Sequence, residues 1–250
     1  MNKESTFILK GKSMVLSSVG NAMRSIKGKF TQKSAVYKPV AKSNFLGWMF
    51  RLRFIKRWDR MHNQRTTDVD LHSHCLNVAT IAHLIGVIKN TKFAGNIDAN
   101  KLGMLAIYHE VAESFTSDLA SPVKYASDDI AREFKVIEHM AEVKCIESLP
   151  ECLREEFGGL IIQDNVDPEY KRIVKAADLL VALSKAKEEV DVAKNSDFVD
   201  AKANLQEKVA SFMDMPEVVY FVDNFAEGYG ITIDRLMMEG DSEVDVERVA

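Results

Sequence analysis

The stretch AIYHEVAESF, residues 106–115, decides how the rest of the chain is interpreted. It is mostly apolar, yet it carries an adjacent His109–Glu110 pair and Glu113 one helical turn after the histidine. Ionisable side chains on a buried apolar helix are costly unless they are paired or bind a metal ion. The zinc-protease motif HExxH is excluded, because Glu113 stands where its second histidine would be. A lone His-Glu pair is more often part of a half-exposed helix surface. Whether this pair forms part of a functional site therefore depends on ionisable residues in the other helices.

Two further groups of ionisable residues interrupt apolar helical stripes. Asp178 lies within KRIVKAADLLVALSK, residues 171–185, where an aspartate has low helix propensity and no capping role. His72 and His74 stand at the start of another apolar helix. Together with His109 and Glu110, these groups form a set of imidazoles and carboxylates from three predicted helices. Such ligands suit a divalent ion such as Mn²⁺, Co²⁺ or Fe²⁺, with Mg²⁺ as a further candidate.

Helical patterns cover almost the whole chain outside its ends. Asp98 is a good N-cap, Pro122 marks a loop, and Pro150 and Pro168 stand at the first turns of helices. Strand-type alternation is nearly absent, so we predict an all-α fold, a single helical bundle with short connections. Helices are expected over residues 45–58, 72–90, 98–115, 128–148, 150 onward, 168–194, 197–213 and 216–228.

Charge divides the chain into three parts. Residues 1–42 carry nine basic residues and one acid, about +8, whereas the rest carries 24 basic and 36 acidic residues, or −12. We therefore expect a basic extension at 1–42, a helical domain at 43–236 and an acidic tail at 237–250. The extension is either a short amphipathic helix or disordered. Because the body is acidic, no specific nucleic-acid partner is expected.

The cysteines and the hydropathy pattern indicate where the protein works. Cys75, Cys145 and Cys152 are odd in number and form no CxxC pair, which argues against a disulfide framework and against a structural zinc site. This favours the cytoplasm or another reducing intracellular compartment. We also expect no membrane span, because no run of about eighteen apolar residues is present.

Longer motifs add a family resemblance. The His…His-Glu…Asp set resembles the metal site of the HD-domain superfamily, and the chain is similar to the bacterial YfbR-type 5'-deoxynucleotidases over roughly residues 44–235. The stretches that carry this resemblance are IKRWDRMHNQRT (55–66), LNVATIAHLI (76–85), IKNTKFAGNIDANKLGMLAIYHEVAES (88–114), TSDLASPVKY (116–125) and VKAADLLVALSKAKEE (174–189). The resemblance implies a single HD-domain bundle, a homodimer, and a metal-dependent phosphohydrolase that removes the 5'-phosphate from deoxyribonucleoside 5'-monophosphates.

The resemblance also implies roles for individual residues. The expected metal ligands are His74, His109, Glu110 and Asp178. Glu113 matches the family's catalytic carboxylate, which orients the attacking water or transfers a proton near it. The expected substrate-binding residues are Arg57 and Lys124 at the phosphate, Trp58 at the sugar and Asp118 beside the substrate.

The chain departs from the family pattern at two places. Glu110 stands where the family has aspartate, so its carboxylate reaches one methylene further and activity, rather than fold, is affected. Two extra residues precede the helix that begins near His72. Counting back nine residues from His83 selects His74 as the ligand, whereas matching the preceding residues selects His72; we expect His74. The alternative functions are a dNTP or dNDP phosphohydrolase on the same fold and a catalytically impaired nucleotide-binding protein.

Overall fold

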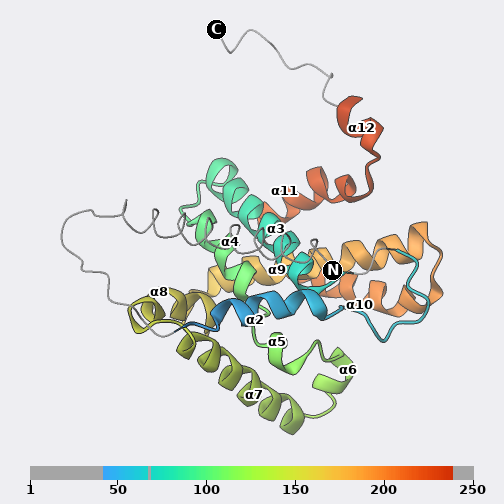
Figure 1. Cartoon of the computed structure of the whole chain (residues 1–250). Coiled ribbons are helices and arrows are strands. Elements are labelled where there is room, and N and C mark those ends of the chain that lie inside the picture. Colours follow the sequence, from blue (N-terminus) through green and yellow to red (C-terminus); the bar gives the residue numbers. More distant parts are fainter. Residues whose placement is uncertain (1–41, 67–68, 239–250) are drawn as a thin grey trace, which may run out of the picture. The chain divides into compact units, whose positions relative to one another are not determined.

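The computed structural model describes residues 42–66 and 69–238 (Figure 1). Within these residues the fold is all-α, as predicted, and the single β-type pairing is an isolated antiparallel bridge between Lys56 and Asp70. The predicted amphipathic helix lies outside the described residues, as do nearly all of the extension and the acidic tail. The elements in chain order are α2 (Phe45–Arg51), the 3₁₀ turn η1 (Leu52–Phe54), α3 (Leu71–Lys92), α4 (Ala99–Tyr108), α5 (Glu113–Thr116), α6 (Ser121–Lys124), α7 (Asp128–Glu147), α8 (Glu151–Ile161), α9 (Pro168–Lys187), the π turn η2 (Glu188–Val192), the 3₁₀ turn η3 (Ser196–Phe198), α10 (Val199–Ala210), α11 (Pro216–Phe225), the 3₁₀ turn η4 (Ala226–Gly230) and α12 (Ile233–Met238).

Helix α3 is the centre of the bundle and packs against α4, α9 and α11 (Figure 1). Its contact with α4 is close because Gly86 has no side chain: a Cβ there would lie 2.6 Å from Leu102 Cδ1 and 3.1 Å from Ala99 Cβ. The main core is formed by buried apolar side chains of these helices, among them Val78, Ile81, Ile85, Leu102, Leu105, Ile173, Leu180 and Val218. The helices α3, α4 and α9, which carry or precede the predicted site residues, therefore belong to the main core.

Side-chain caps fix where several of these helices begin. Asp98 accepts a hydrogen bond from the Lys101 backbone amide at 3.0 Å, as the sequence predicted. Asp70 caps α3 through the Ser73 amide at 2.8 Å. Because a capped start sets the rotation of the whole first turn, the Asp70 cap fixes the direction in which the side chains of α3 point.

Several predicted helices are shorter than expected, and two of the breaks lie beside predicted site residues. The helix over 45–58 ends as η1, because the Arg57 amide donates to the Val69 carbonyl at 2.8 Å and the Leu71 amide donates to that of Ile55 at 2.9 Å. The helix over 98–115 ends at Tyr108 and continues as tight turns to α5. The predicted helix over 168–194 also ends early, at η2.

Helix α3 is long and apolar enough to cross a membrane when judged by length and composition alone. However, 56% of its most apolar window is buried inside the protein. The central helix of a helical bundle has the same properties, so this is weak support for a membrane span.

Candidate metal centre and substrate cavity

Four ionisable side chains from three separate elements meet at one point. His74 comes from α3, His109 and Glu110 from the turn after α4, and Asp178 from α9, and their ligand atoms all lie within 4.8 Å of one another. His74 Nε2 lies 3.2 Å from Asp178 Oδ1, and His109 Nε2 lies 3.4 Å from Glu110 Oε1. The four residues predicted as metal ligands are thus brought together, whereas His72 is exposed and lies outside the group.

The atoms that face one another in this group fit a divalent cation. His74 Nε2, His109 Nε2 and Asp178 Oδ1 are buried and have no hydrogen-bond partner in the described part of the chain. Such atoms cost about 1–3 kcal/mol each when they stay unsatisfied. His109 Nδ1 lies 2.6 Å from the Ala106 carbonyl, and a proton donated there leaves the Nε2 lone pair facing the group.

The charges in the group also suit a cation. Burial, followed by the nearby charge of Arg57, lowers the pKa of His74 to about 4, so the ring is neutral, as a metal ligand must be. Burial alone would raise the pKa of Asp178, but His74 and the Lys175 ammonium, 2.7 Å from Oδ2, hold it well below its usual range. The pKa of Glu110 is also lowered: burial opposes its ionisation, but His109 and Arg57 outweigh it. The group therefore presents the neutral imidazole of His74, the ring of His109 and two carboxylates.

Glu113 lies beside this group without belonging to it. It is the first residue of α5, it is buried, and its Oε2 has no hydrogen-bond partner among the described residues. Burial, with added repulsion from Glu110 and Asp118, raises the pKa of Glu113 to about 10. Glu113 therefore holds a proton at neutral pH and lines the same cavity, of about 510 Å³, as His109, Glu110 and Asp178.

The two cations predicted to contact phosphate both line this cavity, and both are paired with carboxylates. Arg57 Nη1 donates to Glu110 Oε1 at 2.9 Å, and Lys124 Nζ donates to Glu138 Oε1 at 2.5 Å. The sequence analysis did not anticipate either pairing. Glu138 lies on α7, on a helix face that carried no distinguishing pattern.

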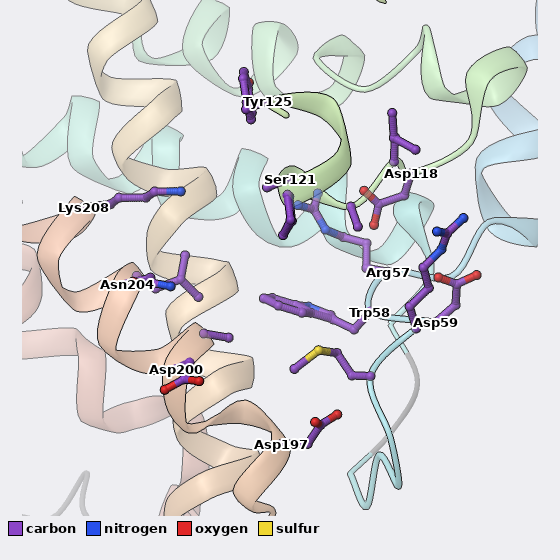
Figure 2. Close-up of a pocket in the computed structure, with 17 residues that line it drawn as sticks. Arg57, Trp58, Asp59, Asp118, Ser121, Tyr125, Asp197, Asp200, Asn204 and Lys208 are labelled. Atoms are coloured by element: carbon purple, nitrogen blue, oxygen red, sulfur yellow. The ribbon is translucent and has the colours of Figure 1, made fainter. Parts of the chain in front are cut away.

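A second cavity, of about 650 Å³, opens between Trp58 and α10 (Figure 2). Residues that line both cavities join them: Arg57, Asp118, Leu119, Ser121 and Tyr125. The α10 wall was missed by the sequence analysis, because its polar residues have the pattern of an ordinary solvated helix face.

Trp58 enters this cavity from a constrained backbone. Its φ is +64°, in the left-handed region that non-glycine residues rarely adopt and that costs about 1–3 kcal/mol at such sites. Its carbonyl accepts hydrogen bonds from Gln64 Nε2 at 2.6 Å and from the Met61 amide at 2.9 Å. The indole packs against Phe198, with ring centroids 5.4 Å apart. The loop that follows Trp58 therefore sets where the indole lies.

That loop is itself fixed by one buried carboxylate, Glu189 in η2. Glu189 accepts hydrogen bonds from the Thr66 amide at 2.9 Å and hydroxyl at 2.7 Å, and from the Arg65 amide at 3.1 Å. Asn195 donates to Glu189 at 3.0 Å and to the Asn63 carbonyl, also at 3.0 Å. The turn that follows α9 thus holds residues 63–66 of the loop after Trp58.

The fold and the arrangement of the site define the class of protein. The structure is similar to an HD-domain phosphohydrolase from Listeria innocua, with a TM-score of 0.64 and 19% identity over 74% of this chain and 87% of that one. It is also similar to the HD phosphohydrolase of cyanophage S-2L, with a TM-score of 0.54 and 17% identity over 77% of this chain and 99% of that one. The fold is therefore that of the HD-domain phosphohydrolases.

Sequence comparison places the chain more narrowly. Residues 44–229 match the family described as 5'-deoxynucleotidase YfbR-like, and the chain belongs to that family of hydrolases. Its relatives include the 5'-deoxynucleotidases of Yersinia pestis (strain Pestoides F) and Yersinia pseudotuberculosis (serotype O:3, strain YPIII). Each is 40% identical over 197 residues, which cover 79% of this chain and 98% of the relative. The family expected from the sequence motifs is confirmed.

Proposed function

We propose that this protein hydrolyses the 5'-phosphate ester of deoxyribonucleoside 5'-monophosphates, with a divalent ion held by His74, His109, Glu110 and Asp178. The observation that carries the proposal is the set of buried, unpartnered ligand atoms facing one point at the wall of a cavity. Membership of the YfbR-like family supports the substrate class. The cyanophage S-2L protein is bound to dA and one catalytic Zn²⁺ ion, which adds Zn²⁺ to the candidates Mn²⁺, Co²⁺, Fe²⁺ and Mg²⁺.

Each polar group at the site has a part in such a reaction. A divalent ion, when bound, lowers the pKa of water and offsets charge on the phosphoryl oxygens. Arg57 would neutralise the phosphate, and Lys124 would approach it from α6. Water attacks phosphorus, the bond from phosphorus to the 5'-oxygen breaks, and the products are deoxynucleoside and inorganic phosphate. Glu113 would exchange its proton with the attacking water or the leaving oxygen.

The second cavity would hold the nucleoside. Trp58 follows Arg57 directly, so a phosphate held by the arginine leaves the sugar close to the indole. The indole has no acceptor for a 2'-hydroxyl and a rigid ring to exclude it. Asp118 lines both cavities and would lie beside the sugar.

A phosphate-release screen tests the reaction. The purified protein, depleted of metal and then supplied with Zn²⁺, Mn²⁺, Co²⁺ or Mg²⁺, is given dNMPs, NMPs, dNDPs and dNTPs. Inorganic phosphate from dNMPs, with less from NMPs, is the expected result. Release of triphosphate or diphosphate would favour the alternative dNTP or dNDP phosphohydrolase. No turnover with any ion, together with nucleotide binding, would favour an impaired nucleotide-binding protein.

We also propose that the protein is a homodimer in a reducing compartment. Leu46, Phe50 and Phe54 recur every four residues along α2 and η1, and each is at least half exposed. A stripe of this kind fits a second copy of the chain. All three cysteines are free, which fits the compartment. Light scattering of the wild type and of Phe50→Glu tests the dimer, and an unchanged mass for the variant would exclude this surface.

A further inference from the structure

The two carboxylate oxygens of Asp178 have different surroundings. Oδ1 lies 3.2 Å from His74 Nε2 and is one of the buried atoms that have no hydrogen-bond partner in the described part of the chain. Oδ2 accepts a hydrogen bond from Lys175 Nζ at 2.7 Å. One oxygen therefore faces the other expected ligands, and a lysine outside the group holds the second oxygen.

The packing of α9 fixes the position of Asp178 but not the rotation of its carboxylate. Its neighbours Ala177 and Leu179 are buried in the main core, so the backbone is held at this point. The terminal torsion of an aspartate is broad, however, and packing of the helix does not select one orientation of the carboxylate plane. A hydrogen bond to one oxygen does select it. Among the described residues, Lys175 is the only one whose side chain donates a hydrogen bond to Oδ2.

Lys175 reaches this oxygen because it stands three residues before Asp178, on the same face of α9. Its side chain is 59% exposed, whereas that of Asp178 is 11% exposed. An ion pair with so exposed a partner contributes little to the stability of the fold. The contribution of the pair is therefore the orientation of a buried carboxylate.

The charge of Lys175 and its hydrogen bond affect a bound cation in opposite directions. An ammonium group repels a divalent ion and weakens its binding. A hydrogen bond that orients a ligating carboxylate strengthens binding, and partners of this kind typically contribute about 10–100-fold in metal affinity. Because the lysine side chain is largely exposed, solvent screens the repulsion, so orientation is the larger effect.

We propose that Lys175 is a positioning residue of the metal centre, which holds Oδ2 of Asp178 and thereby directs Oδ1 toward the ion. This rests on the proposed function, because the ion is the one assigned there. Lys175→Met removes the donor at nearly the same side-chain length, and Lys175→Arg keeps a donor. Lys171→Met is the matched control: Lys171 stands one turn earlier and lines the same cavity, but its Nζ donates to the Asp164 carbonyl at 2.6 Å.

The metal dissociation constant tests the proposal without turnover. The metal-free protein is titrated by calorimetry with Mn²⁺ alone and with Zn²⁺ alone. We expect the dissociation constant to rise by about 10–100-fold in Lys175→Met, to return most of the way in Lys175→Arg, and to stay at the wild-type value in Lys171→Met. An unchanged or lower dissociation constant in Lys175→Met overturns the proposal, and so does an equal rise in Lys171→Met. No binding of either ion by the wild type overturns this proposal and the proposed function together.

Substrate kinetics separate a positioning role from a phosphate contact, since Lys175 also lines the cavity in which the phosphate would lie. With the metal site saturated, Lys175→Met should keep the wild-type KM for dAMP and lose kcat, because the change acts on the ion and not on the phosphate. A raised KM with an unchanged metal dissociation constant would mean that Lys175 binds phosphate, and overturns the positioning role. If the wild type binds the ion but releases no phosphate from any dNMP, the proposed reaction fails, and the dissociation constants still test Lys175.

Discussion

Arg57 Nη1 donates a hydrogen bond to Glu110 Oε1 at 2.9 Å, and the same carboxylate oxygen lies 3.4 Å from His109 Nε2 and 4.0 Å from His74 Nε2. One oxygen therefore lies between the expected phosphate-binding residue and the expected metal ligands. Burial opposes the charge on Arg57, but Glu110 and Asp178 outweigh it and raise the pKa of Arg57 further. The arginine is thus always charged, and Glu110 competes with phosphate for it.

Glu110→Asp tests this competition. The shorter side chain keeps a carboxylate next to His109 but withdraws from Arg57, which then becomes available to phosphate. We expect retained metal and a KM for dNMPs lowered by about 3–10-fold, since a hydrogen bond to a charged group contributes about 1.5–3 kcal/mol and part of it is lost to solvent. Glu138→Asp shortens the partner of Lys124 and tests the same competition at the second cation, so KM should fall there as well. Loss of metal in Glu110→Asp would show that the longer side chain is needed for binding the ion.

Removing single ligands tests the metal group directly. His109→Ala and Asp178→Ala should each lower metal content, measured by elemental analysis, by at least about 10-fold while the chain remains helical. His72→Ala is the matched control, because this exposed histidine lies on the same helix as His74 but outside the group. Full metal content in either ligand variant would disprove the assignment.

Glu113→Gln separates proton transfer from metal binding. The amide has nearly the same shape but exchanges no proton, so the variant should keep its metal and lose about 10²–10⁴-fold in kcat. Metal content and kcat are both measured on the same preparation. If metal content falls together with kcat, Glu113 belongs among the ligands instead.

Sequence patterns predicted the helices, and they selected the four residues that the fold brings together. They did not predict the loops and the side-chain pairings around these residues. Asp98 and the apolar stripes act locally, so their effect is visible in the sequence. The break after Tyr108 depends on tertiary packing, and the left-handed backbone of Trp58 depends on a loop fixed by the distant Glu189. Pairings such as that of Lys124 with Glu138 join elements whose relative positions no local pattern specifies.

Glu189 should make stability depend on pH. Burial alone would raise its pKa, but hydrogen bonds from Asn195, Thr66 and Lys185 outweigh burial and hold it far below the ordinary 4.5. Its contribution is therefore fully present above about pH 4.5 and is lost as pH falls toward the lower, folded-state pKa. Near pH 7, Glu189→Gln should lower the free energy of unfolding by about 1–3 kcal/mol, because amide hydrogens then face backbone donors.

Denaturant unfolding at several pH values measures this effect. The difference between the wild type and Glu189→Gln should shrink as pH falls from 6 to 3. Glu188→Gln changes the exposed neighbour and should leave stability almost unchanged at every pH. A difference that stays constant with pH would mean that the ionised carboxylate of Glu189 does not hold the loop.

Trp58→Ala tests sugar selectivity. The indole is held in the cavity by its left-handed backbone and by Phe198, so it is a rigid wall where the 2'-position of a bound sugar would lie. Removing it should raise the AMP to dAMP ratio of kcat/KM by about 10-fold or more, because the steric exclusion is lost, even if both rates fall. Trp48→Phe, at the other tryptophan, which packs in a separate apolar cluster, should leave the ratio unchanged. A wild type that hydrolyses AMP as well as dAMP, or a ratio that does not move in Trp58→Ala, would mean that the indole only packs against Phe198 and that selectivity for deoxyribose arises elsewhere in the cavity.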